Sequence, residues 1–378
     1  MQEWIDVVRQ HMSHLSRAQA VVLALWSFGM VLARSSGLTS VTHAIAGMTE
    51  EKEDNVRQRL REWNRDRGDK CGKKRQELEV STCFVALLRW VLSWWGAQEH
   101  RMILAMDATT LGDRYVVLAI SVVYRACAIP IAWKVFAFEQ QTAWKPEWLA
   151  MFEAFRQVIP GDWTVLVLAD RGLYANWLFT AIQNLGWHPF LRINANGKYR
   201  PAGSSQFLPL CNLVRQRGDT WSGAVTCFKW RPVRPTLLAC WAEGYTDPWL
   251  ILTDLSPDQA SIAWYGMRSW IECGFRHTKR AGWQWNQTRM TDPNRASRHW
   301  LALAVATLWV VSVGGEVDPL LPASTLDPLP PDQPRPRSNS HPRLLSCFRL
   351  GIFAILFALI KHRPLPMGSF HPIYGPFD

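Results

Sequence analysis

Apolar positions recur at helical spacing through about the first hundred residues. Ser16 is placed to cap a helix that runs to Ala33, and Thr49, followed by acidic residues, is placed to open another. Apolar runs at 39–46 and 84–95 are typical of two more helices. We therefore predict an all-α domain over residues 1–98.

From Arg101 onward the pattern changes to short β-rich apolar runs. The order predicted from these runs is three strands, a helix, a strand, a helix and a strand. The strands are predicted at 102–106, 115–123, 127–136, 164–170 and 188–193, and the helices at 146–158 and 174–185. This is the order of a ribonuclease H-like core. The predicted fold class is therefore α/β, with a mixed sheet and helices over 99–193 as the first part of the core.

The α/β rhythm stops between residues 194 and 250, where glycines separate two further predicted strands at 224–230 and 236–242. We predict a mostly β insertion subdomain there, and a return to the core over 251–314, with a helix that begins at Asp258. Residues 315–378 are predicted to hold a Pro-rich linker, 316–342, and an apolar helix, 344–361.

Composition restricts the class of protein. The 378 residues carry a net charge of +11, which favours a polyanionic partner. Eight cysteines show no metal-binding spacing, as is usual for buried thiols in a reducing compartment. Three apolar runs, 21–33, 301–313 and 350–360, are each shorter than the ~20 residues that span a bilayer. We expect buried helices there, no membrane partner, and a cytoplasmic protein.

The N-terminal helices are compatible with a helix-turn-helix DNA reader. Residues 52–75 hold ten basic residues against five acidic ones. Taken alone, this stretch is as well explained by a solvated amphipathic helix and a charged loop.

One stretch, Trp264–Arg280, concentrates unusual chemistry. On a helix, side chains three and four residues apart share a face. That face is predicted to carry Tyr265, Arg268, Glu272, Arg276 and Lys279. A carboxylate framed by cations suits a divalent metal beside a phosphodiester, although an exposed ion-paired face of little energetic consequence has the same pattern.

Two aspartates strengthen the first interpretation. Asp107 follows the apolar run MILAM, and Asp170 follows TVLVLA. A short buried run that ends in an acid places the carboxylate at the C-terminal edge of a strand, where open sheets build their sites. With Glu272, these aspartates can supply hard oxygen ligands for Mg²⁺ or Mn²⁺.

Tyr265, Arg268, Glu272 and Lys279 fit the Y-(2)-R-(3)-E-(6)-K signature of a large group of bacterial insertion-sequence transposases. Over about residues 100–310 the chain resembles these DDE transposases, with Asp107, Asp170 and Glu272 as the catalytic and metal-binding triad. The resemblance implies a ribonuclease H-like fold, and Tyr265, Arg268 and Lys279 as contacts to DNA phosphates. Further DNA contacts are predicted at Arg276, Arg280, Arg289, Lys198 and Arg200.

The predicted activity is DNA strand cleavage and strand transfer at the terminal inverted repeats of an insertion sequence. Two ions, Mg²⁺ or Mn²⁺, would serve as cofactors. The partners would be the DNA ends and target DNA, with a homodimer in the synaptic complex. Three alternatives remain open: an inert DNA-binding descendant, a related metal nuclease with the same core, and a regulator built on the N-terminal helices.

Overall fold

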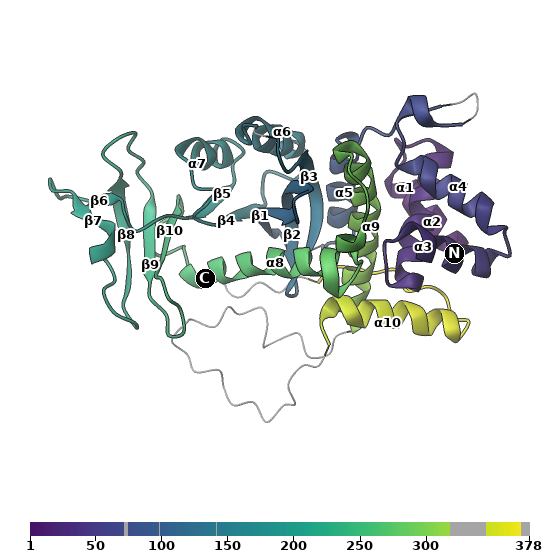
Figure 1. Ribbon diagram of the computed structural model, residues 1–378. Coiled ribbons are helices and arrows are strands. Elements are labelled where there is room, and N and C mark those ends of the chain that lie inside the picture. Colours follow the sequence, from purple (N-terminus) through teal and green to yellow (C-terminus); the bar gives the residue numbers. More distant parts are fainter. Residues whose placement is uncertain (72–74, 98, 141, 318–344, 372–378) are drawn as a thin grey trace.

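The computed structural model describes residues 1–71, 75–97, 99–140, 142–317 and 345–371. Five helices come first: α1 Gln2–His11, α2 Arg17–Ala33, α3 Leu38–Thr49, α4 Glu53–Trp63 and α5 Thr82–Ser93. Ser16 begins α2 through a capping box with Gln19. Thr49 does not open a helix as predicted: it is the last residue of α3, and its hydroxyl donates to the Ile45 carbonyl. The first part of the chain is all-α, and α2 lies buried among its neighbours (Figure 1).

The central sheet has the strand order of a ribonuclease H-like core. Its first five strands are β1 Arg101–Leu111, β2 Tyr115–Tyr124, β3 Cys127–Ala137, β4 Thr164–Ala169 and β5 His188–Arg192. The hairpin-linked β1, β2 and β3 pair antiparallel, whereas β4 pairs parallel to both β1 and β5. The fold class predicted from the sequence is confirmed.

Two helices connect these strands on one face of the sheet. They are α6 Lys145–Phe155 and α7 Asn176–Gln183 (Figure 1). Trp148, Phe152 and Phe155 form the buried face of α6. The opposite face of the sheet is covered by a helix formed by residues much later in the sequence, after β10.

The segment between β5 and that helix extends the same sheet. Its strands are β6 Lys198–Pro201, β7 Leu208–Pro209, β8 Thr220–Cys227, β9 Thr236–Cys240 and β10 Trp249–Thr253. The complete order is β3-β2-β1-β4-β5-β10-β9-β8-β6-β7, with β10 antiparallel to β5. The β insertion therefore lengthens the sheet beyond the edge of β5, which gives the molecule its elongated left half in Figure 1.

The helix that crosses the lower face is composite. A 3₁₀ segment, Ile262–Arg268, leads into α8, Ser269–Arg276, which continues as one π-helical stretch, His277–Ala281. The predicted start at Asp258 is therefore wrong, because the chain becomes helical only at Ile262. Gly274 brings α8 close to the sheet, since a Cβ there would lie 2.8 Å from the Cβ of Ala128 on β3.

Two apolar helices close the structure. α9, Pro293–Val317, is long and apolar enough to cross a membrane, but 89% of its most apolar window is buried inside the protein. α2 and α3 meet that test only as one pair, bent by 96°. α10, Cys347–Ile360, packs across α9, where Gly351 lies against the Val310 backbone. The predicted linker, 316–342, lies almost entirely outside the described residues.

Candidate active site

The two aspartates predicted from strand ends lie side by side on neighbouring strands. The parallel register between β1 and β4 ends at Met106 opposite Ala169, so Asp107 and Asp170 are the next residue on each strand. Asp107 does not end its strand as predicted, because β1 continues to Leu111 in its pairing with β2. The local reason is the same at both positions: each aspartate follows an apolar run buried in the sheet centre and faces the edge where β4 stops.

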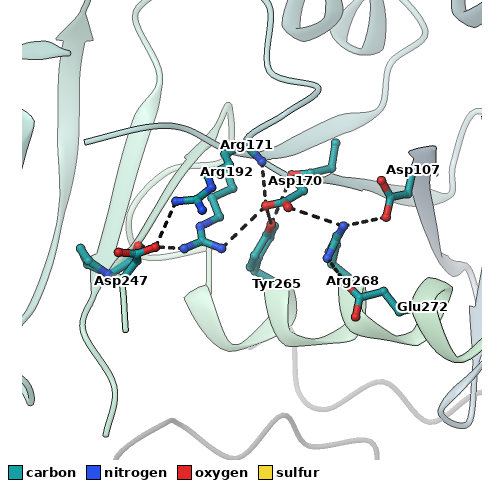
Figure 2. Close-up of polar contacts among 10 residues, drawn as sticks. Asp107, Asp170, Arg171, Arg192, Asp247, Tyr265, Arg268 and Glu272 are labelled. Carbon is teal, nitrogen blue, oxygen red and sulfur yellow. Dashed lines mark hydrogen bonds and ion pairs between the residues drawn. The ribbon is translucent and has the colours of Figure 1, made fainter. Parts of the chain in front are cut away.

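Arg268 joins these aspartates to Glu272. Its Nη2 lies 2.7 Å from Asp107 Oδ2 and 3.6 Å from Asp170 Oδ2. Its Nη1 donates to Glu272 Oε1, one helical turn further along α8. Three carboxylates from three distant parts of the chain therefore converge on one guanidinium group (Figure 2).

Burial and charge shift the protonation equilibria of this cluster in definite directions. Burial raises the pKa of the Asp107 carboxyl, and the nearby Arg268 charge only partly opposes that rise. For Arg268, burial acts to lower the pKa, but the charges of Asp107 and Asp170 prevail and raise it. Asp107 and Arg268 are largely buried, whereas the Glu272 side chain is 60% exposed. Asp107 is thus the inner carboxylate of the cluster, and Glu272 is the outer one that solvent or a ligand can reach.

Tyr265 lies beneath Asp170. Its hydroxyl is 3.4 Å from Asp170 Oδ1 and 3.4 Å from the Ala169 carbonyl oxygen. The ring is 3% exposed and meets the indole of Trp249 edge-on. Burial, followed by the Asp170 charge, raises the pKa of the phenol, so Tyr265 is a neutral hydrogen-bond donor to the carboxylate.

Lys279 reaches the same strand as Asp107, but Arg276 does not reach the cluster. Lys279 Nζ donates to Thr109 Oγ1 at 2.6 Å, two residues along β1 and on the same face as Asp107. Burial and the neighbouring Arg280 lower the pKa of Lys279. Arg276 is exposed, and its guanidinium contacts Cys273 Sγ instead. The prediction that all five polar side chains of this helix share one space is therefore wrong for Arg276, because its guanidinium turns back along α8 to Cys273, three residues earlier.

Two arginines around Asp170 were missed by the sequence reasoning. Arg192, the last residue of β5, places Nη1 3.7 Å from Asp170 Oδ1. The backbone N–H of Arg171 donates to the same carboxylate oxygen at 2.7 Å, and its guanidinium pairs with Asp247 (Figure 2). The signal for Arg192 was available: it closes an apolar strand next to the one that ends at Asp170.

The remaining predicted DNA contacts lie apart from the carboxylates. Arg280 and Arg289 are exposed beyond the end of α8. Lys198 and Arg200 are on β6, separated from β5 by three other strands, and the guanidinium of Arg200 lies over the ring of Phe207.

The donor set of the cluster fits a divalent metal. Three carboxylates supply the hard oxygen atoms that Mg²⁺ and Mn²⁺ prefer, and they already gather around one cation. Arg268 lies between the three carboxylates and keeps them apart. Within the described part of the chain, no three His, Cys, Asp or Glu residues are therefore close enough to hold one ion. Asp107, Asp170 and Glu272 would hold a metal once the guanidinium is displaced.

A ribonuclease H-like sheet with paired aspartates at the β1–β4 edge and a glutamate on a helix from the opposite side defines a class of enzymes that act on nucleic acid phosphodiesters. Residues 131–309 match the family described as the transposase DDE domain. The match runs from within β3 to within α9. Asp170 and Glu272 lie inside it, and Asp107 precedes it. A comparison with curated proteins found no match. The family implies a transposition-related enzyme with DNA as its partner.

Proposed function

We propose that this protein is a transposase that binds the terminal inverted repeats of an insertion sequence and catalyses metal-dependent DNA cleavage and strand transfer. The observation that carries the proposal is the convergence of Asp107, Asp170 and Glu272 on Arg268. These acids are distant in sequence and meet at one point of the sheet edge. Two of them, Asp170 and Glu272, lie within the residues that match the transposase DDE domain.

The residues divide into two sets by charge. Asp107, Asp170 and Glu272 would hold divalent ions, which lower the pKa of bound water and stabilise charge on a phosphate. Arg268 and Lys279 supply positive charge, and Tyr265 a neutral donor, beside the same strands. Cations and a phenol suit phosphate positioning rather than base reading. In the DNA-bound protein, a phosphate would draw Arg268 away from the carboxylates, since the guanidinium forms bidentate contacts with either anion.

Other parts of the chain have proposed roles that follow from position and charge. The N-terminal helical domain, with its basic stretch at 52–71, would bind the terminal repeat. Two copies of the chain would pair in the synaptic complex, because two DNA ends must be joined in one reaction. The cell compartment would be the cytoplasm, where the bacterial chromosome is accessible.

The experiment is cleavage of a labelled duplex that carries the element's own terminal repeat, with Mg²⁺, with Mn²⁺ and with EDTA. We expect metal-dependent cleavage at the repeat boundary by the wild-type protein, and at least a hundredfold slower cleavage by Glu272→Gln. Glu139→Gln is the matched control, since Glu139 is an exposed acid after β3 with no contact to the cluster. Normal cleavage by Glu272→Gln would refute the assignment of the triad. Repeat binding without any cleavage would favour an inert descendant.

A further inference from the structure

A second cationic site lies beyond the end of the π-helical stretch. Three arginines from separate parts of the chain line one cavity of about 420 Å³: Arg34 at the end of α2, Arg280 after Lys279, and Arg349 in the first turn of α10. The cavity is many times the ~30 Å³ that a water molecule occupies in the liquid. It joins the N-terminal domain, the catalytic core and the C-terminal helix at one place.

Among the residues that the structure describes, no acid lines this cavity. Its other described lining residues are Ala33, Ala281, Gly282, Gln284, Leu345, Ile352 and Phe353, none of which can carry negative charge. Among the ion pairs of the described residues, none includes Arg34, Arg280 or Arg349. Like charges that converge without a counter-ion repel one another, and an anionic ligand would relieve that repulsion.

The surroundings show the effect of this positive charge. Burial, assisted by Arg276 and Arg349, lowers the pKa of His277 to about 4. The His277 ring also stacks on Phe348, the residue before Arg349. With a pKa of about 4, this imidazole is neutral at pH 7 and adds no further cation near Arg349.

Two residues of the cavity have a left-handed backbone. Arg34, with a φ of 50°, ends α2 in the αL conformation that closes many helices, and Gln284, with a φ of 56°, precedes the 3₁₀ turn Trp285–Gln287. These two turns bring separate segments of the chain to the same cavity.

We propose that this three-arginine pocket binds a backbone phosphate of the same DNA duplex that enters the active site. The inference rests on the proposed function, because it assumes DNA at the carboxylates. Arg280 follows Glu272 by eight residues, which is about 12 Å at helical rise. With ~3.4 Å of axial rise per nucleotide, the phosphate in the pocket lies on the order of three or four nucleotides from the scissile one. The pocket thereby fixes the register of the DNA end relative to Glu272.

The test combines an arginine variant with DNA in which single phosphates are neutral. We compare repeat binding by the wild-type protein and Arg280→Gln/Arg349→Gln over a range of salt concentrations. Each lost phosphate contact lowers the slope of log K against log [salt] by about 0.9, so the double variant, which loses the one phosphate in the pocket, should lose about that amount. Arg34 is left in place because its left-handed backbone would complicate a substitution. Lys145→Gln/Arg156→Gln is the charge-matched control, because both residues are exposed at the ends of α6, on the face of the sheet opposite α8. It should change neither slope nor affinity.

Methylphosphonate substitution then locates the phosphate. One or two positions, three or four nucleotides from the cleavage point, should weaken binding to the wild-type protein at least fivefold and leave binding to the double variant unchanged. An unaltered salt slope in the variant, or equal sensitivity of both proteins at every position, would overturn the proposal. Wild-type cleavage at the repeat boundary would still support the transposase function in that case. If the double variant does not fold, the two single variants give the same comparison.

Discussion

Arg268 occupies the space between three carboxylates, so replacing it by glutamine should have opposite effects on stability and on metal binding. Asp107 and Asp170 contact the same guanidinium nitrogen at 2.7 and 3.6 Å, which keeps those carboxylate oxygens within about 6 Å of each other. At that separation and an effective dielectric constant of 20, two negative charges repel by about 3 kcal/mol. Without the guanidinium, this repulsion is opposed only by Arg192 on the far side of Asp170. We therefore expect Arg268→Gln to lower the free energy of unfolding at pH 7 by about 2–3 kcal/mol.

The stability deficit should depend on pH. Burial raises the pKa of Asp107 even with Arg268 present, and loss of the positive charge raises it further. A carboxyl group whose pKa is higher in the folded state binds its proton more tightly there. Stability is then lost as the pH rises above the unfolded value of about 3.9 through the folded pKa. The difference between the variant and the wild-type protein should be small at pH 4 and largest at pH 7, as measured by urea denaturation at both pH values.

Metal affinity should change in the other direction. In the wild-type protein a divalent ion must displace Arg268 before the carboxylates can close around it, whereas the variant offers them without competition. A difference of about 1.4 kcal/mol corresponds to tenfold tighter binding. We expect at least that gain for Mn²⁺ binding to DNA-free Arg268→Gln, measured by isothermal titration calorimetry. Arg276→Gln is the control, because Arg276 is on the same helix and contacts no carboxylate. Equal Mn²⁺ affinity of the wild-type protein and Arg268→Gln would refute the view that the guanidinium and the metal compete.

Two further predictions concern other parts of the structure. Arg298 on α9 is 3% exposed, pairs with the half-exposed Asp66 and Glu77 of the N-terminal domain, and donates to the carbonyl oxygens of Asn64 and Leu78. Arg298→Ala should lower the free energy of unfolding by about 1–3 kcal/mol, because those buried carbonyls lose their donor. A thermal transition unchanged from that of the wild-type protein would contradict this. Trp230 is 85% exposed between β8 and β9, beside Lys229 and Arg231. Because an exposed indole can stack on a base, Trp230→Ala should weaken repeat binding by about 1–3 kcal/mol and leave the melting temperature unaltered. The half-buried Trp221, changed to Phe, is the comparison, and equal DNA affinity of the wild-type protein and both variants would contradict the prediction.

The sequence determined the order of the core and the identity of its acids. Apolar runs of strand length ended before Asp107 and Asp170, and periodic apolar positions marked α2, α6 and α9. These signals are local, because burial of one face imposes a period on the chain itself. The signature around Glu272 is equally local, since its other residues each lie within about two turns of Glu272.

Only the tertiary structure decided how those residues meet. The β1–β4 register places Asp107 beside Asp170, and no local pattern encodes a parallel register between strands more than fifty residues apart. The helix that carries Glu272 begins later than its residues favour and ends in a π-helical turn, from which Lys279 reaches Thr109, whereas Arg276 contacts Cys273. Arg268 was predicted to contact DNA, and the structure places it among the carboxylates. Its position depends on the electrostatic balance of three distant acids, a long-range property that appears only when the chain is folded.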